Sequence, residues 1–260
     1  MEFLIFIICL VASTVGGVSG IGGGVIIKPV LDAMGIMSVS AISFLSGLTV
    51  LSMSMISVLR QRKTHLLEIR IGSLLGIGAV VGGIIGNHLF QTVKALAGND
   101  RFVGMVQALV LAIVTLLTLV YSIYGRKRLP SYHVNNELAC AGIGSVMGML
   151  SSFIGIGGGP INLTVLYFAF SMETKKAAAN SLFIIIFSQL SNFLVSCMKG
   201  TIPTFPWHYL PLMVVAGVLG GILGSKINRK ISSETTGKLL AGVLFTIIMI
   251  CLYNVWRFAR

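Results

Sequence analysis

Charged side chains are scarce in this sequence, because Asp, Glu, Lys and Arg make up only 10% of its 260 residues. A soluble domain carries about 25%, so the composition excludes an ordinary soluble domain. Hydrophobic residues make up 55%. They gather in repeated runs of about 17 to 25 residues, the length that crosses a bilayer core as an α-helix. The sequence therefore predicts an all-α integral membrane protein that lies in the lipid bilayer.

Carboxylates are rarer still, with seven Asp and Glu in the whole chain. All but Asp32 fall at expected helix ends or loops, and so do the four histidines. The four cysteines lie in separate apolar segments without metal-ligand spacing. An intramembrane enzyme would need a clustered nucleophile, an acid–base pair or a metal set at depth. We see none, so we expect no enzyme activity, no cofactor and no metal.

Positive charge is more abundant, with a formal net charge of +12. The Lys and Arg side chains sit between the apolar runs, where such residues set membrane topology and contact lipid headgroups. We therefore expect no nucleic-acid partner.

One glycine-rich motif stands out, and it occurs twice. The motif at Gly20–Gly24 returns letter for letter at Gly155–Gly159. Each copy interrupts an apolar segment, and a regular helix cannot continue cheaply through it, at about 1 kcal/mol per Gly. Backbone N–H groups freed at membrane depth must be buried against protein or bind a ligand. Tight helix crossings are the simpler interpretation, and an anion site is the other.

The remaining apolar runs and their basic or polar boundaries predict the other helices. We expect helices at about residues 3–19, 25–34, 38–59, 66–89, 102–124, 137–154, 160–170, 177–198, 207–225 and 238–256. A polar loop of about eleven residues is expected after the helix at 66–89.

The glycine motif belongs to an internal repeat. Val80, Gly82, Gly83, Ile84 and Gly86 match Val218, Gly220, Gly221, Ile222 and Gly224. We divide the chain into a first membrane repeat at 1–128, a cytoplasmic linker at 129–136 and a second membrane repeat at 137–260, together one transporter domain. Internal repeats of this kind are typical of secondary transporters.

The basic residues predict that the two repeats are inverted. If each glycine-broken segment crossed the membrane once, Lys and Arg would be divided evenly between the two sides. If each segment turns back at its glycines, most of the 19 fall on the cytoplasmic side, as the positive-inside rule requires. These are Arg60, Arg62, Lys63, Arg70, Arg126, Lys127, Arg128, Lys175, Lys176, Lys226, Arg229, Lys230 and Lys238. Each repeat is then a re-entrant helix hairpin plus three transmembrane helices, and both termini are extracytoplasmic.

Two hairpins that enter from opposite faces would bring their glycine tips together at mid-membrane. Each returning arm begins at its glycines, and a helix N-terminus presents free N–H donors with about half a positive charge. Glycine lacks Cβ, so a ligand can approach the backbone closely. The expected backbone ligands of a small anion are Gly20, Gly22, Gly23, Gly24, Gly155, Gly157, Gly158 and Gly159.

Polar side chains near the tips complete the candidate site. They are Ser19, Ser46 and Thr49 in the first repeat and Asn162, Asn180, Ser181 and Gln189 in the second. Hydroxyls and amides orient an oxyanion without trapping it as tightly as an arginine would. The alternative is that these hydroxyls bond to their own helix backbone, as hydroxyls in membrane helices often do.

Lys28 is the one basic residue close to a glycine motif. Ionisable residues at membrane depth are functional by default, so we include Lys28 as a substrate ligand. The alternatives are an ion pair with Asp32, four residues on, and a side chain that reaches the outer surface. Leu163 occupies the matching place in the second repeat, so this charge would be one-sided.

The duplicated glycine motif, the paired halves and the small size resemble the sulfite exporter TauE/SafE family, also called the toluene-sulfonate uptake permease family. The resemblance covers essentially the whole chain. It implies a transporter of sulfite or of small organosulfur anions such as sulfonates. The backbone argument leads independently to a small anion, whereas sulfur comes only from the resemblance.

We therefore expect a secondary transporter of the plasma or inner membrane that exports small sulfur-containing anions by alternating access, as two inverted halves rock around the glycine tips. An inside-negative potential contributes about 2.3 kcal/mol per charge per 100 mV, so potential alone is sufficient to drive export. The alternatives are a transporter of another small anion or solute and a non-transporting structural membrane protein. A homodimer is compatible with the scheme.

Overall fold

The computed structural model describes residues 1–64, 66–125 and 131–259, and this part of the chain is helical with no strand. The helices are α1 (Glu2–Ser19), α2 (Gly24–Met34), α3 (Val39–Gln61), the short η1 (Arg62–Thr64), α4 (Ile69–Ala97), α5 (Asp100–Val120), the π-helical turn η2 (Tyr121–Gly125), α7 (Glu137–Ile154), α8 (Gly159–Phe170), α9 (Thr174–Met198), α10 (Tyr209–Lys230) and α11 (Ser233–Ala259). Eight helices of the described chain are long and apolar enough to cross a membrane. The all-α membrane fold is confirmed.

The expected polar loop after the helix at 66–89 is wrong. α4 continues to Ala97, and only Gly98 and Asn99 separate it from α5. Gly98 ends α4 in the left-handed region at φ 59°, and the Asn99 side chain accepts a hydrogen bond from the N–H of Arg101 at the start of α5. These two residues therefore make the whole turn, since one ends a helix and the other caps the next.

The expected linker at 129–136 lies partly outside the described residues, as do the basic residues at 126–128. Its described part runs along the end of α8. The N–H groups of Tyr132 and Val134 donate to the carbonyls of Phe168 and Ala169, at 2.8 and 3.0 Å.

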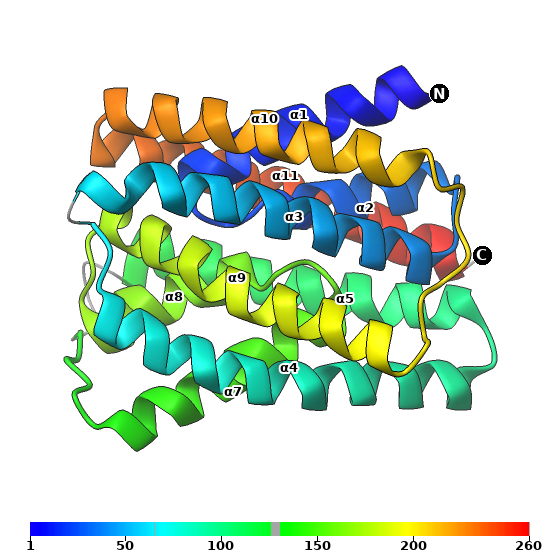
Figure 1. Cartoon of the computed structure of the whole chain (residues 1–260), viewed down its shortest axis with the longest axis horizontal. Coiled ribbons are helices and arrows are strands. Elements are labelled where there is room, and N and C mark those ends of the chain that lie inside the picture. Colours follow the sequence, from blue (N-terminus) through cyan, green and yellow to red (C-terminus); the bar gives the residue numbers. More distant parts are fainter. Residues whose placement is uncertain (65, 126–130, 260) are drawn as a thin grey trace.

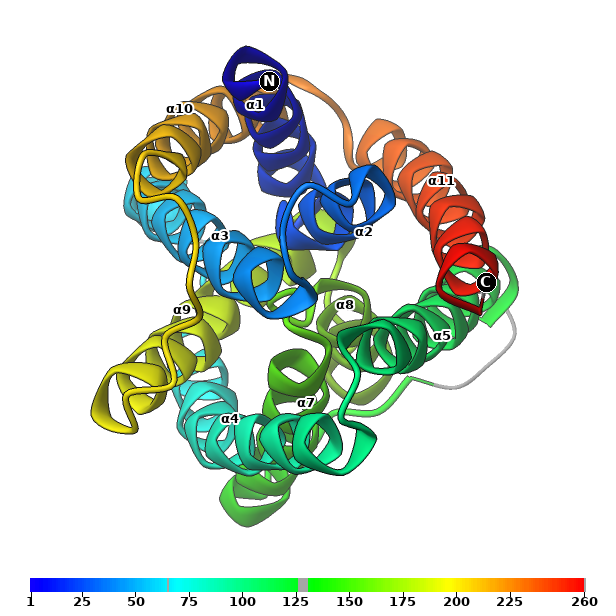
Figure 2. The same ribbon diagram turned by 90° about the vertical axis from the view of Figure 1, so that its right-hand side faces the viewer.

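The helices run along one common direction, and both chain termini lie at the same end of the bundle (Figure 1). We call this the terminal end. α1 starts there and runs inward, and α2 returns to it; α7 starts at the opposite end, and α8 returns to that end (Figure 1). Seen along the bundle, α2 and α8 lie near its centre with the longer helices around them (Figure 2). Each glycine motif is thus the turn of a helical hairpin inside the protein.

The closest helix packing joins elements of different repeats, because α4 packs on α7 and α1 packs on α10. Glycines make both contacts close. A Cβ atom at Gly78, Gly82 or Gly86 would lie 1.8 to 2.2 Å from the carbonyl oxygens of Ala141, Ser145 and Met149, respectively. Small residues let membrane helices approach closely in this way. Neither half of the sequence therefore packs as a separate unit.

The two glycine loops touch each other. A Cβ atom at Gly159 would lie 1.5 Å from the carbonyl oxygen of Ile21, and one at Gly24 would lie 2.5 Å from the carbonyl oxygen of Ile156. The four residues are buried. These contacts confirm the expectation that the tips of the two hairpins lie next to each other.

The loop contact predicts a sharp difference between two Gly→Ala variants. Gly159→Ala would force the loops apart and should lower the free energy of unfolding by about 3 kcal/mol or more. Gly142 lies on an exposed face of α7 with nothing within 4 Å of an added Cβ, so Gly142→Ala should be neutral or stabilising by up to about 1 kcal/mol. Thermal unfolding in detergent measures both. Equal stability of the two variants would contradict the contact.

Candidate functional site

The first glycine loop is held by α9. Gly20 ends α1 at φ 80°, where its N–H donates to the carbonyl of Gly16, and Gly22 follows at φ 77°. This left-handed backbone favours glycine. Ser181 of α9 donates to the carbonyl of Gly20 at 2.6 Å. A Cβ atom at Gly20 would lie 2.3 Å from Cα of Ala178, so α9 packs directly against the loop.

The second loop repeats this geometry against α3. Gly155 ends α7 at φ 74°, and its N–H donates to the carbonyl of Ser151. Gly157 and Gly158 follow at φ 87° and 81°. A Cβ atom at Gly155 would lie 2.8 Å from Cβ of Ser43 in α3, and Ser43 holds the place in the repeat that Ala178 holds in α9.

Both loops contain backbone N–H groups that have no backbone acceptor within the described chain. In the first loop the backbone ladder stops at Gly20 and resumes at Ile26; in the second it stops at Gly155 and resumes at Asn162. α8 starts inside the bundle and runs to the opposite end (Figure 1). Its free N–H groups, and the positive end of its dipole, therefore point toward the terminal end.

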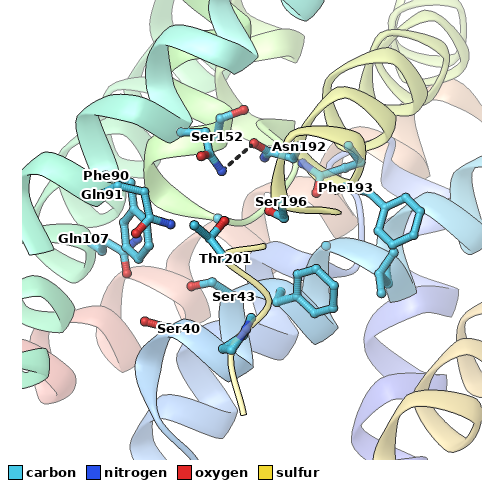
Figure 3. A pocket seen from close by; sticks show the side chains of 17 residues that line it. Ser40, Ser43, Phe90, Gln91, Gln107, Ser152, Asn192, Phe193, Ser196 and Thr201 are labelled. Carbon is cyan, nitrogen blue, oxygen red and sulfur yellow. Dashed lines mark hydrogen bonds between the residues drawn. The ribbon is translucent and has the colours of Figure 1, made fainter. Parts of the chain in front are cut away.

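A cavity opens at the terminal end and reaches Gly155 in the second loop. It encloses about 600 Å³, open mouth included. Its polar side chains come from α3, α4, α5, α7, α9 and the loop before α10, and they surround a common space (Figure 3). They are Ser40, Ser43, Asn87, Gln91, Gln107, Ser152, Gln189, Asn192, Ser196 and Thr201, and Phe44, Phe90 and Phe193 contribute apolar walls.

The cavity is rich in hydrogen-bonding groups and carries no charged side chain among its described lining residues. Several of its polar atoms are buried without a partner, including Ser43 Oγ, Ser152 Oγ and Gln189 Nε2. Lys94 Nζ donates to Ser40 Oγ at 2.7 Å, but Asp100 balances its charge, with Oδ1 3.7 Å from Nζ. Burying a hydroxyl or an amide N–H without a partner costs about 1 to 3 kcal/mol. These groups therefore favour a small ligand whose oxygens accept their hydrogen bonds.

The structure brings only two of the sequence-predicted side-chain and glycine ligands, Gly155 and Gln189, into this cavity. Ser19 and Thr49 donate to the carbonyls of Val15 and Leu45 in their own helices, which is the alternative that the sequence left open. Ser46 Oγ and Asn162 Oδ1 are buried without a partner outside the cavity.

The Asn180-Ser181 pair has a structural task in this conformation. Asn180 Oδ1 accepts from the N–H of Glu68, and its Nδ2 donates to the carbonyls of Leu66 and Lys176. Asn180 thus ties α9 to the turn before α4, and Ser181 ties α9 to the first glycine loop. Neither lines the cavity.

Sequence reasoning missed the contribution of α4 and α5. Asn87, Gln91 and Gln107 line the cavity, but they lie outside the repeated glycine motif that guided the search. One signal was available: Gln107 is an amide inside the apolar run of α5, and it is 1% exposed. Gln107 Nε2 donates to the carbonyl of Phe153 at 2.7 Å, which links α5 to the last turn of α7.

Lys28 lies in an ion pair and not in this cavity. Its Nζ is 2.6 Å from Oδ2 of Asp32, one turn on in α2, and both side chains are buried. Of the three arrangements that the sequence allowed, the ion pair is the one present.

The chain is similar in sequence to known membrane proteins. The family described as "Sulfite exporter TauE/SafE" matches residues 5–251. "Probable membrane transporter protein YunE" of Bacillus subtilis (strain 168) is 26% identical, and the alignment covers 95% of this chain and 96% of that protein. No solved structure gives a significant match.

Two serine variants should separate a structural hydroxyl from a cavity hydroxyl. Ser181→Ala removes a buried hydrogen bond to Gly20 and should lower the free energy of unfolding by about 1 to 3 kcal/mol. Ser43→Ala removes an unpartnered hydroxyl and should change stability by less than about 0.5 kcal/mol. Thermal unfolding in detergent without ligand gives both values. A Ser43→Ala variant as unstable as Ser181→Ala would mean that Ser43 Oγ is bonded after all.

Proposed function

We propose a substrate and a mechanism for this chain, which belongs to the sulfite exporter TauE/SafE family. The chain is accordingly a membrane transporter of that family. Its substrate is a small oxyanion, and the family points to sulfite or a small organosulfonate.

The observation that carries the proposal is the cavity above the second glycine loop. Hydroxyl and amide groups line it, and the N-terminus of α8 points toward the end of the bundle at which it opens. Such an arrangement stabilises negative charge without a buried cation. Because no charged side chain among the described lining residues holds the ligand, an anion can also leave, which a transport cycle requires.

The transport step is alternating access. In the present conformation the cavity opens at the terminal end, and the touching glycine loops lie between it and the opposite end. The bodies that we expect to move are α1, α2, α3 and α10 on one side and α4, α7, α8 and α9 on the other. The closely packed pair α5 and α11 joins them, because α11 packs on α2 and α5 packs on α8. The two bodies meet at the glycine loops and at the α3–α9 contact. The cavity lies within one chain, and a homodimer stays a prediction.

We take the direction of transport and the orientation of the chain in the membrane from the sequence. Export from the cytoplasm, with both termini extracytoplasmic, places the open cavity on the outer face. The excess of basic residues at the opposite end supports this orientation.

Transport assays on two matched serine variants test the binding site. Ser43 lines the cavity, whereas Ser54, also in α3 and also buried with an unpartnered Oγ, does not. A hydrogen bond to a charged ligand contributes about 1.5 to 3 kcal/mol, so Ser43→Ala should raise KM about tenfold or more, and Ser54→Ala should leave it unchanged. Gln189→Leu should act like Ser43→Ala. The glycines themselves are a poor test, because Leu at Gly158 would be strained at φ 81°.

The measurement is flux in proteoliposomes loaded with sulfite, thiosulfate, sulfate or a small sulfonate. Transport of none of these anions by the wild type would overturn the anion function. Normal KM values for both Ser43→Ala and Gln189→Leu would show that the anion binds elsewhere.

Cysteine labelling tests the orientation. Thr201 lines the cavity in the loop before α10, and Cys197 is the one exposed cysteine of the described chain. In a Cys197→Ser background, Thr201→Cys should react with a membrane-impermeant maleimide added outside intact cells, and sulfite should slow the reaction. Labelling only in inverted vesicles would reverse the orientation.

A further inference from the structure

A second, much smaller cavity lies between α2, α5 and α11. Its walls include Lys28, Asp32, Gln107, Cys251 and Asn254. It has room for about one water-sized particle. Sulfite or a sulfonate is too large for it, so this cavity is not a second substrate site.

Three of the side chains that line this small cavity each have a buried acceptor oxygen without a donor. Asp32 Oδ2 is paired with Lys28, but Asp32 Oδ1 has no partner, and neither do Gln107 Oε1 and Asn254 Oδ1. The three side chains are 1 to 5% exposed. An unpartnered carboxylate oxygen buried beside two amide oxygens is costly. The ligand that this set accepts is a proton or a small cation that prefers oxygen.

The charges on and around the Lys28–Asp32 ion pair nearly cancel. Lys28 balances Asp32, and Arg257 of α11 donates to the backbone carbonyls of Asp32 and Ala33 at the end of α2. Of the titratable groups of α11, the Cys251 thiol lines this cavity, and α5 contributes only the uncharged Gln107 to its polar lining. A cation that enters would therefore leave an unbalanced positive charge inside the bundle.

The ion pair has no counterpart in the other repeat. Leu163 and Tyr167 occupy the places in α8 that Lys28 and Asp32 occupy in α2. A buried ion pair is often no more stabilising than apolar residues of similar size. The matching hairpin at α8 folds without such a pair, and ionisable residues at membrane depth commonly have a functional task.

We propose that the cavity of Asp32, Gln107 and Asn254 binds one monovalent cation, Na⁺ or H⁺, and that this cation binds together with the transported anion. The inference rests on the proposed anion function and adds the coupling ion to it. Na⁺ would be held by the three oxygens, and a proton would reside on Asp32 and be donated to an amide oxygen.

Gln107 supplies the physical link between the two ligands, because it lines both cavities. Its Nε2 holds the carbonyl of Phe153, two residues before Gly155, and its Oε1 faces no donor. An anion in the large cavity would balance the charge of a cation on the other side of this side chain. Each ligand therefore tightens the binding of the other by the same factor.

This coupling replaces the sequence-based hypothesis that membrane potential alone drives transport. An anion that travels with one cation carries less net charge, and its flux follows the cation gradient. An inward cation gradient would drive uptake, so this coupling also replaces the export direction proposed above. A binding measurement on the purified protein distinguishes the two hypotheses and needs no membrane.

The experiment measures the Kd of thiosulfate for the purified protein by isothermal titration calorimetry. Thiosulfate keeps its charge across neutral pH, so any pH effect belongs to the protein. One arm replaces choline with Na⁺ at fixed pH, and the other lowers the pH without Na⁺. The wild type should bind thiosulfate about tenfold more tightly in one arm, and the arm that responds identifies the cation.

The variants assign the effect to the cavity. Lys28→Met combined with Asp32→Asn removes both charges and leaves no unpaired ion, and this double variant should lose the cation dependence. The control is Glu234→Gln with Lys238→Met, an exposed ion pair at the same four-residue spacing, which should keep it. If the double variant does not fold, Asn254→Ala takes its place and should weaken the cation effect.

The outcomes are distinct. A wild type that binds thiosulfate equally well under all conditions overturns the coupling and leaves the anion function standing, with only water in the small cavity. A wild type that binds none of thiosulfate, sulfite, sulfate and a small sulfonate overturns both proposals. A cation effect that survives in the Lys28–Asp32 double variant places the cation elsewhere and overturns this site.

Discussion

The structure depends on one constraint: irregular backbone at membrane depth must be covered by protein. The two glycine loops meet this constraint by covering each other, with the carbonyl of Ile21 packed against Gly159. α9 packs against the first loop and α3 against the second, and Ser181 bonds to Gly20. Glycine is required at this contact because a single Cβ atom would separate the loops. In the sequence the glycine motif looks like a helix breaker. In the fold its two copies form the contact at the centre of the bundle.

The features that could be predicted from the sequence are those set by local residue patterns and by the internal duplication. Apolar runs predicted the helices, and the repeated motif predicted that the glycine tips meet. The end of α4 was missed because Gln91 and Lys94 look like loop residues, although a helix end carries polar side chains equally well. The cavity was missed because five helices build it, and no spacing along the chain reveals which faces of α3, α4, α5, α7 and α9 converge. Polar residues chosen by nearness to the glycines, such as Asn180, instead support the turns between helices.

Positions at which the two repeats carry different residues distinguish the two ends of the bundle. Ser43 and Ala178 hold matching positions in the two repeats. Ser43 brings a hydroxyl to the large cavity, whereas Ala178 has no hydroxyl. Lys28 and Asp32 replace the Leu163 and Tyr167 of the other hairpin. The shared residues build the scaffold, and the unshared polar residues distinguish its two ends. Gln107, which touches both cavities, belongs to this second group.

The glycines of α4 have a further consequence for movement. Gly78, Gly82 and Gly86 each face a carbonyl of α7, and those carbonyls also recur at four-residue intervals. A slide of α4 along α7 by one such interval, about 6 Å, would set Gly82 over the carbonyl that Gly78 now faces, and Gly86 over the next. The same slide would also place Phe90 over the carbonyl of Met149, where a Cβ atom at Gly86 would already lie 2.2 Å from the oxygen. The glycine contacts therefore hold α4 and α7 in a single register, so that the two helices move together as one body during transport.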